Sequence, residues 1–142
     1  MSEIVIDAAS EQDTDRLGAD LAARLPAGAV VSLTGTLGAG KTRLVQAIAA
    51  ACGVPREEVV SPTFVLCQQY SGTRTINHLD AYRLKGEDEF RELGAAELLN
   101  SDALTIVEWG DKIASALPAD HVRIDIDVIG PTSRRFTIRG LP

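Results

Sequence analysis

A glycine-rich segment followed by a lysine and a threonine has the clearest chemistry in this chain. Residues 35–42 read GTLGAGKT and match the pattern G-x-x-x-x-G-K-[ST]. Glycines allow backbone conformations that point successive N–H groups at one anion, and the following helix adds its positive end. Lys41 would supply a mobile charge to the β- and γ-phosphates of a nucleotide, and the Thr42 hydroxyl would coordinate Mg²⁺. The pattern predicts a nucleoside triphosphate site.

Two acidic residues are candidates for the carboxylate that a magnesium–nucleotide site requires. Glu108 follows the apolar run 104–107, and Asp80 follows the less apolar run 76–79. The carboxyl ends of parallel strands meet at one edge of a sheet, so both positions fit, Glu108 better than Asp80. The residues alone leave open which carboxylate binds the metal directly.

Other polar residues near these positions have a functional and a structural interpretation. Thr63, in the segment 61–64, could sense the γ-phosphate, although a Ser-Pro turn is the favoured interpretation. His78 could carry a proton, but a structural histidine is favoured. Trp109 is as well suited to core packing as to covering a ligand. Arg83 could neutralise transition-state charge, and a surface ion pair is the more common role.

The elements that must position this loop follow from the hydrophobic pattern. A buried strand over 29–34 leads into the loop, and a helix over 41–52 follows it. The other predicted strands are 3–7, 64–70, 74–79, 103–107, 122–129 and 135–139, and the other predicted helices are 10–25, 88–100 and 111–117. Buried strands between helices predict a three-layer α/β sandwich, with a mixed sheet that is parallel at its centre and has antiparallel edge hairpins. We expect residues 1–142 to form one domain.

Composition limits the classes of partner. The chain is 45% hydrophobic and 24% charged, which is typical of a globular protein. Its net charge of −6 disfavours direct binding to RNA or DNA, apart from a local patch such as Arg134-Arg135. The apolar runs are too short for a membrane span and the start is unlike a signal peptide, so a cytoplasmic protein with reduced thiols is expected.

Four segments in this order resemble the TsaE family (also called YjeE), the small P-loop ATPases of tRNA threonylcarbamoyladenosine (t6A) synthesis. They are GTLGAGKT at 35–42, SPTF at 61–64, HLDAYR at 78–83 and VEWG at 107–110. The last two are far more discriminating than the phosphate loop, which many unrelated ATPases share. The resemblance extends over nearly the whole chain and implies a P-loop NTPase-like fold.

The resemblance also implies roles for individual residues. Lys41 and the loop amides would hold the β- and γ-phosphates, and Thr42 and Glu108 would serve Mg²⁺. Asp80 would orient or activate the water for hydrolysis. The residues expected to contact ATP are Glu11 (near the adenine), Gly35, Leu37, Gly38, Ala39, Gly40, Lys41, Thr42, Arg43, Thr63 and Trp109. Thr36 and Arg43 stand where the family usually has Asp and Thr. We expect these two differences to affect the strength of metal or nucleotide binding and not whether binding occurs.

The family acts with TsaD and TsaB proteins, so the resemblance implies those partners, with tRNA reached through the complex. Three other functions share the loop. A small-molecule kinase needs an acceptor pocket and a lid, for which this chain has little spare length. A GTPase typically needs N-K-x-D late in the chain, and the nearest match, NHLD at 77–80, lacks the lysine and comes too early. A regulatory clamp with little turnover is the third.

Overall fold

The computed structural model describes residues 3–36, 38–60, 67–82, 84–92 and 94–142. The helices are α1 (Glu11–Arg24), α2 (Lys41–Ala51), α3 (Glu87–Glu92), α4 (Ala95–Leu99) and the 3-10 helices η1 (Arg56–Glu58) and η2 (Gly110–Ala116). The strands are β1 (Glu3–Ala8), β2 (Val30–Gly35), β3 (Cys67–Ser71), β4 (Thr75–Asp80), β5 (Leu104–Glu108), β6 (Val122–Val128) and β7 (Arg134–Arg139). None of the helices in the described ranges has the length and hydrophobicity that a bilayer crossing requires.

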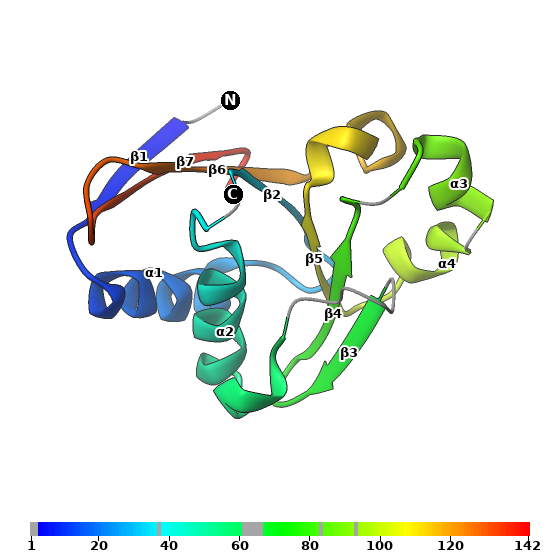
Figure 1. Cartoon of the computed structure of the whole chain (residues 1–142). Coiled ribbons are helices and arrows are strands. Elements are labelled where there is room, and N and C mark those ends of the chain that lie inside the picture. The colour runs from blue at the N-terminus through cyan, green and yellow to red at the C-terminus, as the bar shows by residue number, and fades with distance from the viewer. Residues whose placement is uncertain (1–2, 37, 61–66, 83, 93) are drawn as a thin grey trace.

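The described strands form one seven-stranded sheet in the order β1-β7-β6-β2-β5-β4-β3 (Figure 1). At its centre β2 pairs in parallel with both β5 and β6, and β4 pairs in parallel with β5. At the two edges β3 pairs antiparallel with β4, and β7 pairs antiparallel with β6 and β1. The predicted mixed sheet with a parallel centre and antiparallel edges is therefore confirmed.

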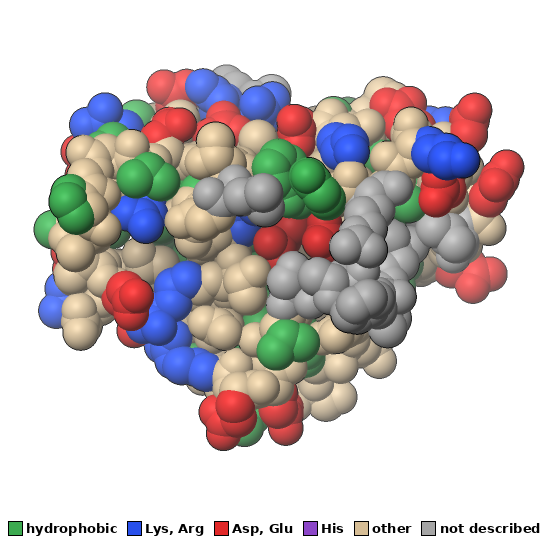
Figure 2. All heavy atoms as spheres, in the orientation of Figure 1, with side chains coloured by type: hydrophobic (Ala, Val, Ile, Leu, Met, Phe, Trp, Pro, Cys, Tyr) green, Lys and Arg blue, Asp and Glu red, His purple; other side chains and the backbone are tan. Residues whose placement is uncertain are grey.

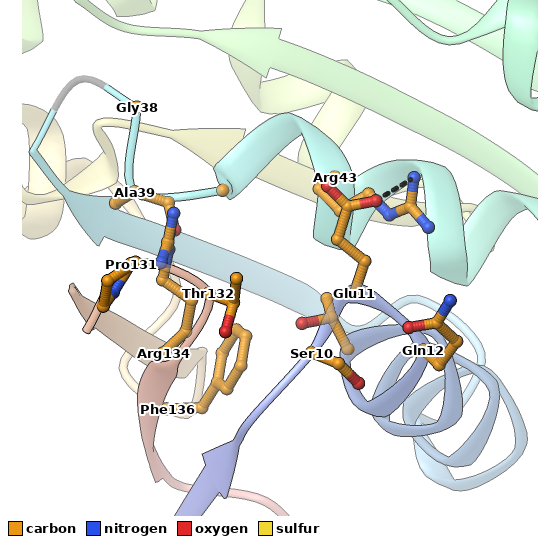
Figure 3. A pocket seen from close by; sticks show the side chains of 12 residues that line it. Ser10, Glu11, Gln12, Gly38, Ala39, Arg43, Pro131, Thr132, Arg134 and Phe136 are labelled. Atoms are coloured by element: carbon orange, nitrogen blue, oxygen red, sulfur yellow. Dashed lines mark hydrogen bonds and ion pairs between the residues drawn. The ribbon is translucent and has the colours of Figure 1, made fainter. Parts of the chain in front are cut away.

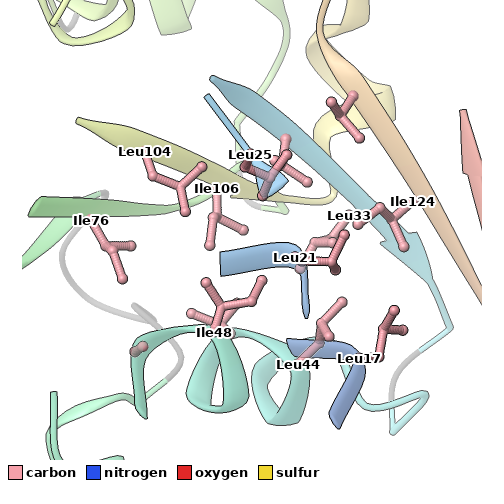
Figure 4. Packing of buried hydrophobic residues seen from close by; sticks show 14 of the residues in the cluster. Leu17, Leu21, Leu25, Leu33, Leu44, Ile48, Ile76, Leu104, Ile106 and Ile124 are labelled. Atoms are coloured by element: carbon pink, nitrogen blue, oxygen red, sulfur yellow. The ribbon is translucent and has the colours of Figure 1, made fainter. Parts of the chain in front are cut away.

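Helices lie on both faces of the sheet because its central strands are apolar on both sides. One hydrophobic cluster joins α1 and α2 to the sheet, and Figure 4 shows Leu21 and Ile48 facing the strand residues there. A smaller cluster on the opposite face joins Val107 to Phe90 of α3 and Ile113 of η2. Each fully buried Leu, Ile or Phe side chain contributes roughly 2 kcal/mol to stability. The predicted three-layer arrangement is confirmed.

Three predicted elements differ from the structure. The helix predicted over 88–100 is divided into α3 and α4, because Gly94 has a φ of +81°, which an α-helix cannot contain. The predicted helix over 111–117 is a 3-10 helix, η2. The strand predicted over 64–70 is observed as β3, and residues 64–66 lie outside the described ranges. Cys52 and Cys67 are free thiols, as expected.

The ends of α1 are held by side chains. At its start the Ser10 Oγ accepts from the Asp13 amide at 3.3 Å, and Asp13 Oδ2 accepts from the Ala9 amide, one residue before the N-cap, at 3.1 Å. At its end Arg74, from the β3–β4 connection, donates to the carbonyl oxygens of Ala22 (3.0 Å), Leu25 (2.6 Å) and Pro26 (2.8 Å). This guanidinium therefore joins the β3–β4 hairpin to the C-terminus of α1.

Replacing Arg74 with Met should lower the free energy of unfolding by about 2 kcal/mol. The variant keeps the apolar stem and leaves three carbonyl oxygens without their charged donor. Urea denaturation measures the effect. The matched control is Arg24→Met, which removes an exposed ion pair to Asp20 at 3.6 Å from the same end of α1. That variant should change stability by less than about 0.5 kcal/mol, and equal losses in both variants would show that Arg74 is an ordinary surface residue.

Candidate nucleotide-binding site

The phosphate loop lies between β2 and α2, as predicted. Gly40 is the N-cap of α2 with a φ of +106°, a conformation that favours glycine. The Lys41 ammonium lies across the loop and donates to the carbonyl oxygens of Gly35 at 2.6 Å and Thr36 at 3.0 Å. Within the described residues, the amides of 40–43 have no backbone acceptor. Backbone amides at the N-terminus of a helix, with a lysine beside them, are suited to bind phosphate.

Lys41 also contacts Trp109. Its Nζ lies 4.2 Å from the centroid of the indole ring, within the range of a cation–π interaction. Burial lowers the pKa of Lys41, and the negative charges of Glu108, Asp80 and Asp111 act in the opposite direction. The ammonium is thus partly desolvated, which strengthens its attraction to a bound anion, while the acidic side chains favour its charged form. Figure 2 shows acidic and hydrophobic side chains side by side near the centre of this face.

The two candidate acids end neighbouring parallel strands in the same register. Asp80 of β4 is paired with Glu108 of β5, and Glu108 is also paired with Leu33 of β2, two residues before the loop begins. Glu108 is only 3% exposed, and both of its carboxylate oxygens lie 3.4 Å from Thr42 Oγ1. Both carboxylates therefore lie at the edge of the sheet that holds the loop, as the positions of Asp80 and Glu108 at the ends of predicted parallel strands indicated (the strand-end rule).

Asp80 is less buried than Glu108 and is held by its own turn. Its Oδ1 accepts from the Tyr82 amide at 2.8 Å. Burial raises the pKa of Asp80, while the Tyr82 amide favours its charged form, Glu108 raises the pKa further, and His78 and Lys41 lower it. One carboxylate oxygen is fixed in this way, and the other has no hydrogen-bond partner among the described residues.

His78 is in contact with Glu108, which the sequence interpretation did not predict. His78 Nε2 lies 2.5 Å from Glu108 Oε2, and His78 Nδ1 lies 3.0 Å from the Tyr70 hydroxyl. The imidazole is completely buried. Because side chains two residues apart on a strand share a face, the spacing of His78 and Asp80 on one strand could have indicated this contact.

Trp109 has the one left-handed backbone among the described residues other than glycine, with a φ of +60°. Its amide donates to the Leu33 carbonyl oxygen at 2.8 Å, and its ring packs against Tyr82 at a centroid distance of 5.0 Å. An unfavourable conformation held in this way is typical of functional sites. Trp109 is half-buried, so it both packs on the smaller cluster and borders the loop.

A pocket of about 430 Å³ lies beside the loop, between the start of α1 and the β6–β7 turn (Figure 3). Its lining residues are Ser10, Glu11, Gln12, Thr14, Gly38, Ala39, Gly40, Arg43, Pro131, Thr132, Arg134 and Phe136. Glu11, which the resemblance placed near the adenine, is one of these residues, and its contact with a nucleotide stays a prediction. The pocket adjoins the phosphate loop and is large enough for a nucleoside.

Arg43 points away from the phosphate loop. Its guanidinium forms ion pairs with α1, at 3.0 Å to Asp15 and 3.4 Å to Glu11, so it joins α1 to α2 at the rim of the pocket. Of the remaining expected ATP contacts, Leu37 and Thr63 lie outside the described residues.

Comparisons with known proteins agree on one family. The family described as threonylcarbamoyl adenosine biosynthesis protein TsaE matches residues 8–136. A protein of that name from Treponema pallidum is 40% identical over 129 residues, which cover 91% of this chain and 95% of the relative. Another from Streptomyces coelicolor is 41% identical over 133 residues, 88% of each chain. The crystal structure of YdiB from Bacillus subtilis superposes with a TM-score of 0.78 at 25% identity, covering 99% of this chain and 87% of that one.

Proposed function

Because this chain belongs to the TsaE family, we propose that it binds and hydrolyses ATP in the synthesis of threonylcarbamoyladenosine on tRNA. One observation carries the nucleotide part of the proposal. The loop of residues 35–42 opens a helix, has a lysine across it, and has the Thr42 hydroxyl 3.4 Å from a buried carboxylate at the end of the neighbouring strand. The pocket beside the loop supports binding of the nucleoside.

The donor set fits Mg²⁺. Thr42 Oγ1 and the Glu108 carboxylate are hard oxygen donors close to each other, and Mg²⁺ typically takes few protein ligands and keeps waters and phosphate oxygens. No group of three or more His, Cys, Asp or Glu side chains in the described part of the chain forms a self-sufficient metal site. When bound, Mg²⁺ would neutralise charge on the phosphates during transfer. Thr42 and Glu108 are the residues that would hold it.

The other residues have separate roles in this proposal. The loop amides and Lys41 bind the β- and γ-phosphates. For this the Lys41 ammonium exchanges its hydrogen bonds with the Gly35 and Thr36 carbonyl oxygens for hydrogen bonds with phosphate oxygens. Asp80 accepts a proton or a hydrogen bond from the attacking water through Oδ2, the carboxylate oxygen that does not accept from the Tyr82 amide. The Trp109 ring, which lies against the Lys41 ammonium, limits the access of water to it.

The partners in this proposal are proteins of the TsaD and TsaB families, which would transfer the threonylcarbamoyl group while this chain supplies ATP hydrolysis. The net charge of −6 supports a subunit that contributes little direct contact with tRNA. A cytoplasmic location agrees with a role in tRNA modification. ATP binding by this chain would be the first step, and it can be tested alone.

Calorimetric titration with Mg²⁺ and ATP should give a saturable heat, and the emission of Trp109, the only tryptophan, should change. The change is expected because phosphate draws the Lys41 ammonium away from the indole ring. Lys41→Met should weaken ATP binding by roughly tenfold or more, since it removes a charge-assisted hydrogen bond.

The matched control for Lys41→Met is Lys112→Met. Lys112 lies 5.4 Å from the Tyr82 ring in the same region, outside the loop. Its replacement should leave ATP affinity unchanged. An absence of heat with the unmodified chain, or equal affinity in Lys41→Met, would contradict the proposed function.

A further inference from the structure

Two adjacent arginines of β7, singled out in the sequence as a possible basic patch, point to opposite faces of the sheet. Arg135 is exposed to solvent, and its Nε and Nη2 pair with Asp7 of β1 at 2.8 and 3.1 Å. Arg134, one residue earlier, is half-buried and lies beside the phosphate loop. The pair is therefore no continuous cationic surface, and only Arg134 is close to the nucleotide site.

Arg134 joins the β6–β7 turn to the loop. Its Nε donates to the carbonyl oxygen of Ala39 at 2.9 Å, and its Nη1 donates to the carbonyl oxygens of Ser133 at 3.0 Å and Gly130 at 3.3 Å. Figure 3 shows the guanidinium against Ala39 in the pocket wall. Because the guanidinium is planar and rigid, two bonds to the turn fix the direction in which the third holds the loop.

The bond to Ala39 determines the orientation of the next amide. In a planar trans peptide the carbonyl oxygen of one residue and the N–H of the next point in opposite directions. With the Ala39 carbonyl directed at Arg134, the Gly40 N–H points away from Arg134, and it has no backbone acceptor among the described residues. Gly40 has a φ of +106°, and glycine has little intrinsic preference that would hold this peptide in place.

We propose that Arg134 is a positioning residue that holds the Ala39–Gly40 peptide with its amide directed at the β-phosphate of the bound nucleotide. The inference rests on the proposed function for the identity of the ligand. It differs from a direct charge effect, in which the guanidinium would attract phosphate from any position nearby. In the positioning role the hydrogen bond from Nε matters, and the positive charge alone is insufficient.

Two substitutions separate the hydrogen bond from the charge. Arg134→Lys keeps the charge but has a methylene group where arginine has Nε, and Arg134→Met removes both. Arg135→Met, which breaks only the exposed pair with Asp7, is the control. ADP and AMP binding are measured by calorimetry, since only ADP has a β-phosphate. Hydrogen exchange of the amides in 38–42 is measured without nucleotide, and thermal unfolding verifies that each variant is folded.

Both Arg134 variants should bind ADP about tenfold more weakly and AMP as the unmodified chain does, because a single amide contact is affected. Their loop amides should exchange about tenfold faster, and Arg135→Met should change neither quantity.

Normal ADP affinity in Arg134→Lys would overturn the proposal in favour of a charge effect. Equal weakening of ADP and AMP binding would also overturn it, because Arg134 would then only shape the pocket that holds the nucleoside. Unchanged loop exchange would overturn it without reference to any nucleotide. If instead the unmodified chain binds no ADP while loop exchange responds as expected, the proposed function fails and the positioning of the loop stands.

Discussion

Replacing Asp80 with Asn should lower ATP turnover by about a hundredfold or more and leave ATP affinity almost unchanged. The amide keeps the size of the side chain and an oxygen that can accept from the Tyr82 N–H, so the turn after β4 should be preserved. It lacks the negative charge and the second acceptor oxygen, which in the proposed mechanism orients the attacking water. The loss should therefore fall on the chemical step.

The measurement is release of phosphate, with calorimetry of ATP binding on the same samples. Asp111→Asn is the matched control, because Asp111 also acts electrostatically on Lys41 but is exposed in η2. It should leave turnover near normal. The assay is repeated with TsaD and TsaB family proteins, which should raise the rate of the unmodified chain and not that of Asp80→Asn. Normal turnover in Asp80→Asn would mean that another residue positions the water.

The parts of the site that the sequence predicted are those determined by local rules. The loop follows a buried strand and opens a helix because its glycines and its lysine are contiguous in the chain. Asp80 and Glu108 meet because each ends a parallel strand, and the strand-end rule needs only the order of the elements. The sheet with a parallel centre was predictable for the same reason.

The contacts that were missed join residues far apart in sequence. Arg134 contacts Ala39 only because the β6–β7 turn returns beside the loop, and no local pattern encodes that distance. Arg43 turns toward α1 because Asp15 lies across the helix pair. The division of the helix predicted over 88–100 has a local cause, Gly94, but a glycine within a helical pattern is often tolerated. His78 is intermediate, since its place on the same strand face as Asp80 could have indicated the contact with Glu108, although its residue type favoured only a structural role.

The contact between His78 and Glu108 leads to the prediction with the largest effect on stability. Replacing His78 with Leu should lower the free energy of unfolding by about 3 kcal/mol. Glu108 is 3% exposed, and among the described residues its shortest hydrogen bond is to the imidazole, at 2.5 Å, since Thr42 lies at 3.4 Å. Leucine fills the space but leaves a buried carboxyl group without this partner.

Urea denaturation of a double-mutant cycle isolates that contribution. In a Glu108→Met background no buried carboxyl group remains, so His78→Leu should destabilise the protein much less, with a coupling of about 2 kcal/mol. Tyr70→Phe removes only the hydroxyl 3.0 Å from His78 Nδ1 and should lower stability by about 1 kcal/mol. His78→Gln, whose amide can donate to Glu108, should recover part of the loss. Equal effects of His78→Leu in both backgrounds would show that the imidazole is retained for packing, and Glu108 would then depend on other groups for its orientation toward Thr42.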